Sequence, residues 1–159
     1  MIFVTLGSQK FQFNRLLISI DQLIQSGLIS DKVFAQIGYS DYVPHSFKYT
    51  NFLDREKFTK YIDQSNVVIT HGGTGAIIGA VKKGKKVIAV PRLSKYGEHV
   101  DDHQKQIVKQ FAEMKFIVAC YDVINLQESL SVVQNLIVPK YHSNTDVILE
   151  SIDDFLESI

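Results

Sequence analysis

Short apolar runs alternate along this chain with segments whose apolar residues recur at helical spacing. Residues 2–6 are rich in β-branched side chains and predict a strand, whereas residues 13–24 repeat apolar positions three or four apart and predict a helix that Gly27 ends. The same patterns predict further strands at residues 33–37, 48–52, 67–70, 86–90 and 116–120. They predict further helices at residues 56–64, 74–83, 100–113, 126–136 and 145–159.

This alternation predicts one α/β domain over residues 1–159. Strand and helix in turn are typical of a doubly wound, Rossmann-like parallel sheet with helices on both faces. The sequence contains no internal repeat, low-complexity segment or linker-like stretch that would divide it. Ligands of such sheets bind outside the carboxyl ends of the strands, so the polar turns after the predicted strands are the candidate site.

The loop after the strand at residues 67–70 reads His71-Gly72-Gly73-Thr74-Gly75. Glycines remove the Cβ atoms that would keep a phosphate from the backbone, and N–H groups at the start of the next helix can bind an anion. The hydroxyl of Thr74 can cap that helix or bond a phosphate oxygen. The alternative is that the glycines only permit a tight turn. Neither a Walker loop nor the GxGxxG fingerprint is present, so nucleotide hydrolysis and hydride transfer lose their main support.

Gly7-Ser8-Gln9-Lys10 forms a second loop between a predicted strand and a predicted helix. It can offer N–H groups and a hydroxyl to a phosphate. A capped turn without any ligand is the alternative for this loop.

Residues 92–104 place two cations, three acids, two histidines and a glutamine within thirteen positions after a predicted strand. Loops this dense in hydrogen-bonding groups are suited to hydroxyl-rich ligands, since carboxylates accept from sugar hydroxyls and glutamine both donates and accepts.

Other chemistry is open to the same segment. His99 and His103 are four residues apart and could share a helix face as metal ligands, although the sequence shows no third ligand. Asp101 or Asp102 could simply cap a helix, which is compatible with ligand binding. No serine of the candidate loops lies in a G-x-S-x-G elbow, so no acyl-transfer triad is visible.

Composition narrows the classes of protein. The 159 residues are 45% hydrophobic and 21% charged with a formal net charge of zero, as in ordinary soluble domains, and no basic excess points to nucleic acid. We expect a cytoplasmic protein, because the sequence starts without a signal-peptide pattern and has no apolar run of about 20 residues that could span a bilayer. The single Cys120 follows an apolar run, and a buried thiol is the expected role rather than a nucleophile.

Four motifs in a fixed order resemble the C-terminal, nucleotide-sugar-binding half of GT-B glycosyltransferases, and the resemblance covers nearly the whole chain. The motifs are Val4-Thr5-Leu6-Gly7-Ser8, Phe52-Leu53, Thr70-His71-Gly72-Gly73-Thr74-Gly75, and Pro91 with Asp101-Asp102-His103-Gln104. The chain is most similar to the stand-alone, PssE-like subunits of bacterial capsular and exopolysaccharide synthesis. It also resembles the small catalytic subunit of the eukaryotic UDP-GlcNAc transferase of N-glycan assembly.

The resemblance implies how a nucleotide-sugar donor would be bound. Residues implied to face the phosphates are Gly7, Ser8, Gln9, His71, Gly72, Gly73, Thr74 and Gly75. Phe52 and the backbone of Leu53 would line the uracil, and Asp101, His103 and Gln104 would contact the donor sugar. One departure is Gly79, where many related transferases have a Glu that binds the ribose hydroxyls.

Transfer develops negative charge on the leaving diphosphate, which helix dipoles and cationic or neutral donors can stabilise without a metal. His71, the catalytic candidate, is expected to do this together with Arg92 and Lys95. No cofactor and no metal are therefore expected, the UDP-sugar being the donor substrate.

The resemblance further implies one half of an inverting, two-component enzyme. It would transfer a hexose of galactose or N-acetylglucosamine type from a UDP-sugar to a lipid-linked saccharide. A membrane-associated glycosyltransferase subunit would supply the acceptor-binding half and hold the chain at the inner face of the membrane. The amphipathic helix at residues 145–159 could dock that partner, pack on its own sheet, or form a homodimer.

Two other functions stay open. The chain could be a non-catalytic activator of its partner, for which Gly79 is the main support. A sugar-nucleotide epimerase would share the fold class but would need more acids and histidines along a longer chain.

Overall fold

The computed structural model describes residues 1–141 as six strands, five α-helices and two short 3₁₀ segments. The helix predicted at residues 145–159 lies outside the described residues. The strands are β1 (Ile2–Thr5), β2 (Val33–Gln36), β3 (Lys48–Thr50), β4 (Val67–Thr70), β5 (Lys86–Ala89) and β6 (Val118–Ala119). The helices are α1 (Asn14–Gln25), α2 (Arg55–Gln64), α3 (Thr74–Val81), α4 (His103–Glu113) and α5 (Leu126–Gln134), with η1 (Ser94–Tyr96) and η2 (Val123–Asn125).

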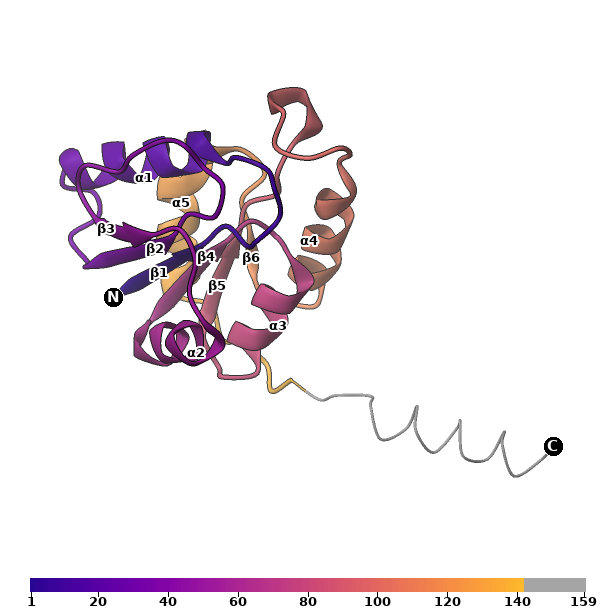
Figure 1. Ribbon diagram of the computed structural model, residues 1–159. Helices are drawn as coiled ribbons and strands as arrows, with labels where there is room; N and C mark the ends of the chain where they lie inside the picture. Colours follow the sequence, from indigo (N-terminus) through magenta and orange to yellow (C-terminus); the bar gives the residue numbers. More distant parts are fainter. Residues whose placement is uncertain (142–159) are drawn as a thin grey trace.

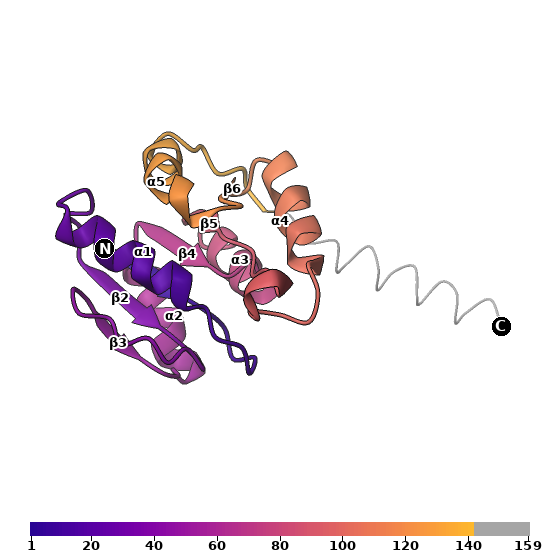
Figure 2. The same cartoon turned by 90° about the horizontal axis from the view of Figure 1, so that it is seen from above.

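All strand pairs are parallel, in the order β3-β2-β1-β4-β5-β6 (Figure 2). The chain therefore runs outward from β1 in one direction and from β4 in the other. At their carboxyl ends the central strands are in step, since Thr5 is paired with Gln36 on one side and with Thr70 on the other. This confirms the predicted doubly wound α/β fold.

Helices cover both faces of the sheet (Figure 1), and on each face a hydrophobic cluster packs the helices against the strands. α1 and α5 bury Leu16, Leu17 and Leu126 against one face. α2, α3 and α4 cover the other face, where buried apolar residues of all three helices join the cluster. β1 and β4 are buried throughout and are apolar up to a final threonine, as expected for strands of a parallel sheet that is covered on both sides.

Most predicted boundaries lie within two residues of the observed ones; the start of α4 differs by three residues, and β6 is the most shortened strand. The helix predicted from residue 100 begins at His103, because Asp101 and Asp102 form the turn before it and Asp101 Oδ1 accepts from His103 N at 3.0 Å. The strand predicted at residues 116–120 is reduced to β6, an edge strand with only two registered positions on β5. Cys120 is buried, as predicted. Within residues 1–141, no helix is long and apolar enough to cross a membrane.

Candidate functional site

A cleft of about 530 Å³ opens at the carboxyl ends of the central strands. The direction of the chain along the sheet changes between β1 and β4, and doubly wound sheets bind ligands at this point. The loop after β1 approaches the start of α3 there (Figure 1). The cleft is lined by Thr5, Gly7, Ser8, Gln9, Gln36, Leu53, Arg55, Phe58, His71, Gly73, Gly75 and Ala76.

The imidazole of His71 lies between the two glycine loops. A Cβ atom on Gly7 would come within 2.6 Å of His71 Cε1, and one on Gly73 within 2.4 Å of His71 Nε2, both far below a normal contact. Gly7 also has a φ of +73°, which other residues adopt only with strain. Both glycines are therefore required for the ring to sit where it does.

His71 is 8% exposed and is bonded to the strands beneath it. Nδ1 lies 3.3 Å from the carbonyl oxygen of Thr5, which can only accept, so Nδ1 carries the proton and Nε2 is left as an acceptor. Burial, together with the nearby charge of Arg92, lowers the pKa of His71 to about 4, although the bond to Thr5 opposes this shift. The ring is thus neutral at pH 7 and brings no positive charge to the cleft in this structure.

Arg92 lies beneath the cleft and has no exposed surface. Its Nη2 donates to the carbonyl oxygens of Leu6 at 2.6 Å and Phe11 at 3.2 Å, and its guanidinium lies over the ring of Phe13. Burial lowers the pKa of Arg92 to about 10, with Glu98 opposing the change, so it is charged at pH 7. The sequence predicted that Arg92 binds the donor. In this structure it holds the loop of residues 7–11 from below, and its charge acts through the field it creates.

The residues predicted to contact a sugar lie beside the cleft, on the loop of residues 92–102 and the start of α4. Asp101 and His103 are exposed at the end of this loop. Gln104 is buried, and its Oε1 accepts from Arg92 N at 3.0 Å. Asp102 Oδ1 accepts from both Ser94 N and Ser94 Oγ, each at 2.9 Å. Bonds from Lys105 and from Ser94 hold the pKa of Asp102 well below its usual range.

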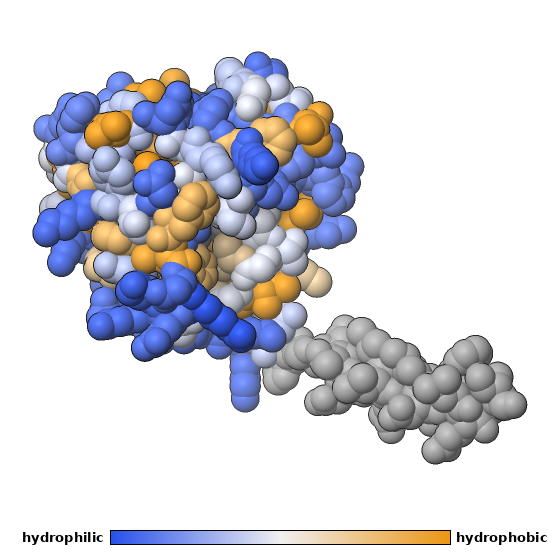
Figure 3. Space-filling model, viewed as in Figure 1, coloured by the Kyte–Doolittle hydropathy of each residue, from blue (hydrophilic) through white to orange (hydrophobic). Residues whose placement is uncertain are grey.

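Exposed aromatic side chains border the cleft on the side of β3. Phe52 is half-exposed and packs edge-to-face against Tyr39 with ring centroids 5.1 Å apart. The space-filling view shows hydrophilic residues over α2 and apolar ones gathered next to it (Figure 3). Leu53 lines the cleft but Phe52 does not, so the predicted uracil pair lies across its edge.

The structure brings together in one cleft Gly7, Ser8, Gln9, Leu53, His71, Gly73 and Gly75 of the predicted residues. Outside its lining are Phe52, Gly72, Thr74, Arg92, Asp101, His103 and Gln104. Sequence reasoning missed Thr5, Gln36, Arg55, Phe58 and Ala76. A usable signal was present for Thr5 and Gln36, because each is the polar residue that ends an apolar strand. The buried Thr5 Oγ1 and Gln36 Oε1 have no hydrogen-bond partner within the described part of the chain.

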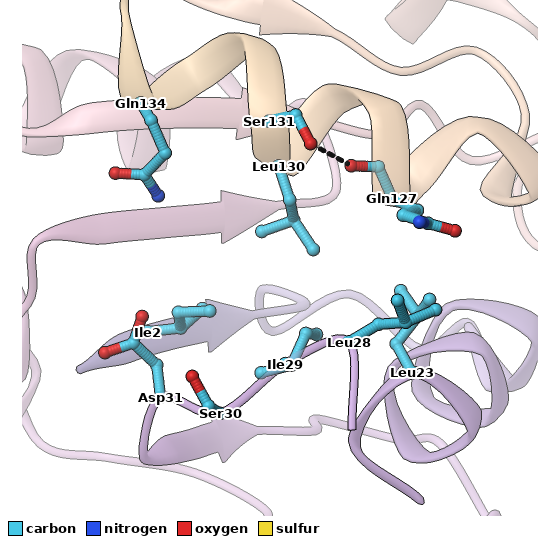
Figure 4. A pocket seen from close by; sticks show the side chains of 10 residues that line it. All are labelled: Ile2, Leu23, Leu28, Ile29, Ser30, Asp31, Gln127, Leu130, Ser131 and Gln134. Carbon is cyan, nitrogen blue, oxygen red and sulfur yellow. Dashed lines mark hydrogen bonds between the residues drawn. The ribbon is translucent and has the colours of Figure 1, made fainter. Parts of the chain in front are cut away.

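A second cavity of about 310 Å³ lies at the opposite end of the sheet, between α5 and the turn after α1 (Figure 4). Ile2, Leu23, Leu28, Ile29 and Leu130 give it an apolar floor. None of the predicted site residues lines it. Across residues 1–141, no group of three or more His, Cys, Asp or Glu side chains is placed to hold a metal ion.

Comparison with known families adds to this geometry. The family model described as "Glycosyltransferase family 28 C-terminal domain" matches residues 1–155. The UDP-N-acetylglucosamine transferase subunit ALG13 of Candida glabrata is 34% identical over 95 residues, which cover 58% of this chain and 43% of that protein. Human ALG13, with the same description, is 25% identical over 126 residues, which cover 75% of this chain and 11% of that protein. The matches therefore span less than half the length of either relative.

Solved structures share the fold. An NMR solution structure of ALG13 superposes with a TM-score of 0.59 at 21% identity and covers 89% of both chains. The calicheamicin glycosyltransferase CalG4 gives a TM-score of 0.59 at 17% identity, covering 86% of this chain and 36% of that one. MurG of Acinetobacter baumannii gives 0.57 at 16% identity, with 84% and 41% covered. The six-stranded domain thus corresponds to part of each larger glycosyltransferase and to most of the small ALG13 chain.

Proposed function

The chain belongs to the glycosyltransferase family 28 C-terminal domain family, and we propose that it is the donor-binding subunit of a two-component, inverting glycosyltransferase. The observation that carries this proposal is the cleft at the switch between β1 and β4, where two glycine loops enclose the ring of His71. Both loops present backbone rather than side chains, which suits a diphosphate.

We further propose that the donor is a UDP-sugar carrying a hexose of galactose or N-acetylglucosamine type. The description of the ALG13 relatives as subunits of a UDP-N-acetylglucosamine transferase supports the second sugar. The acceptor in this proposal is a lipid-linked saccharide of a surface polysaccharide, capsule or exopolysaccharide. This part of the proposal rests on the resemblance of the sequence motifs to PssE-like subunits.

In the proposed reaction the diphosphate leaves as the acceptor oxygen attacks the anomeric carbon. At the start of α3, Ala76 N and Ile77 N both donate to Gly73 O. The N–H groups before Ala76 have no carbonyl of their own helix to bind. They can stabilise the charge that develops on the leaving group, together with the buried charge of Arg92. Neutral donors of this kind require no metal and no cofactor. His71 contributes as a spacer and an acceptor, since its ring is neutral.

The acceptor site and the catalytic base would be on a membrane-associated partner, which would bring the chain to the cytoplasmic face of the membrane. The word "subunit" in the description of both ALG13 relatives supports a partner. A non-catalytic activator is the second candidate, favoured by the absence of any acidic residue from α3, whose sequence is TGAIIGAV.

The test is transfer of labelled sugar from a panel of UDP-sugars to a lipid-linked acceptor in membranes, with the chain and its candidate partner expressed singly and together. The proposal expects incorporation only with both chains, and expects it to fall on the order of tenfold at low donor concentration when Gly75→Ala is introduced here. If the partner alone binds the donor and transfers the sugar, and the chain only raises the rate, the activator function holds instead.

A further inference from the structure

The loop of residues 92–102 turns one carboxylate away from solvent. Residues 94–97 are exposed, whereas Glu98 is only 1% exposed. The reversal occurs at Gly97, whose φ of +66° lies in the left-handed region, while no atom lies within 4 Å of a Cβ built there. The backbone conformation, and not a lack of space, therefore requires this glycine.

The Glu98 carboxylate ties the loop to α1. Its Oε1 accepts from Arg15 Nε at 2.6 Å and its Oε2 accepts from Leu93 N at 2.9 Å. Arg15 also donates from Nη2 to Pro91 O at 2.9 Å, and its guanidinium lies over the ring of Tyr96 at 5.0 Å. One arginine of α1 thus contacts the start, the tip and the returning part of the loop.

The same ion pair relates this loop to the phosphate-facing loop of residues 7–12. Arg15 is the second residue of α1, the helix that follows that loop. Further bonds join the two loops, from Gln12 Nε2 to Tyr96 O at 3.0 Å and between His99 Nε2 and Gln9 Oε1 at 3.2 Å. Neither Arg15 nor Glu98 lines the 530 Å³ cleft, so their effect on a ligand there passes through the loops.

We propose that Arg15 and Glu98 are positioning residues. They fix the loop of residues 92–102 and the start of α4, which are expected to contact the donor sugar, relative to the phosphate-facing loop of residues 7–12. This inference rests on the proposed function. A largely buried ion pair suits the task, because removing one partner leaves the other as an unpaired buried charge and so disfavours other arrangements of the loop. The pair sets discrimination between UDP-sugars and has little influence on the uridine diphosphate part.

The test compares Glu98→Gln, which keeps the shape of the side chain, with Asp63→Asn as the control. Asp63 forms an exposed ion pair with Lys83, away from the cleft lining. Calorimetry on the full chain gives the affinity for UDP, UDP-GlcNAc, UDP-glucose and UDP-galactose. We expect Glu98→Gln to lower the preference for the best UDP-sugar over UDP at least fivefold, with the affinity for UDP changed less than twofold. The control should leave both unchanged.

Arg15→Lys is the second variant and carries the test if Glu98→Gln does not fold. It keeps the charge but loses the second bond to Pro91 O, so a smaller loss of preference is expected. An unchanged preference with only a lower melting temperature would overturn the proposal, since a purely structural pair predicts that result.

Failure of the proposed function can be told apart from failure of the positioning role. If the wild-type chain binds no UDP-sugar, or none better than UDP, the proposal that this chain recognises the donor sugar is rejected. Hydrogen exchange then decides the positioning role by itself. Faster exchange in both residues 7–12 and 92–104 of Glu98→Gln supports it, and unchanged exchange in either loop rejects it.

Discussion

His71 acts as a spacer between two loops that offer few side chains of their own. Its ring occupies the room left by Gly7 and Gly73, and its Nδ1 is held by Thr5 O. Because the ring is neutral, attraction for a diphosphate rests on backbone N–H groups, on the buried Arg92 and on Arg55 in the cleft lining. The cost of charging this ring makes the site sensitive to acid.

Stability should therefore fall as the pH drops below about 6.5. The pKa of His71 is about 4 in the folded chain against an ordinary value of 6.5, so the unfolded chain takes up this proton first. The contribution is complete above pH 6.5 and is lost as the pH falls toward 4, up to about 3 kcal/mol. Urea unfolding of the wild type and of His71→Gln at pH 7, 5.5 and 4.5 measures it. A difference between the two proteins that does not shrink with acid would contradict the prediction.

Two glycines of one loop should respond differently to alanine. Gly73→Ala places a Cβ within 2.4 Å of His71 Nε2 and should destabilise the chain by about 1–3 kcal/mol. Gly75→Ala meets no atom within 4 Å and lies within α3, so the melting temperature should hold or rise. Because Gly75 lines the cleft, its variant should still bind UDP on the order of tenfold more weakly, by blocking close approach. Full UDP binding by Gly75→Ala would show that this glycine serves only the turn.

At the scale of elements, the sequence determined the strands and helices where one local pattern dominated. The apolar run of β4 ends at glycines, and its predicted bounds were those observed. Local pattern failed where a distant partner decides. α4 begins later than predicted because Asp101 and Asp102 form the turn before it, a turn that the bond from Ser94 to Asp102 holds from eight residues earlier. β6 pairs with β5 at only two positions. A distant partner also explains why Arg92 is buried and does not line the cleft, because its guanidinium donates to the carbonyl oxygens of Leu6 and Phe11.

α3 should be stabilised by Gly79→Ala. Gly79 lies in the last part of the helix with no atom within 4 Å of a Cβ built there, and glycine in a helix interior costs about 0.5–1 kcal/mol relative to alanine. Thermal and urea unfolding should both show this gain. UDP binding should be unchanged, because Gly79 does not line the cleft. Weaker binding by this variant would indicate that a ligand group lies against α3 at this position.

At the scale of the whole molecule, the fold placed the predicted loops together and also added residues from other elements. The rule that ligands bind at the carboxyl ends of parallel strands predicted the meeting of residues 7–9 with residues 71–75. It did not predict that Arg55 and Phe58 line the cleft, because their positions depend on how α2 packs against the sheet. Arg55 is the cleft's one exposed cation among the described residues that line it, so it is the side chain that can meet a phosphate directly.

The 530 Å³ cleft and the 310 Å³ cavity lie at opposite ends of the sheet, and ligand binding should distinguish them. UDP at 100 times its dissociation constant should stabilise the chain by about 2.7 kcal/mol. Hydrogen exchange should slow in the segments 7–9, 55–58 and 71–76, which contain most of the residues that line the 530 Å³ cleft. Exchange in the segments 28–31 and 127–134, which contain most of the lining of the 310 Å³ cavity, should change only by the amount common to the whole fold. Protection centred on those residues would move the nucleotide to the other end of the sheet, where Asp31 beside apolar side chains offers a diphosphate no favourable charge.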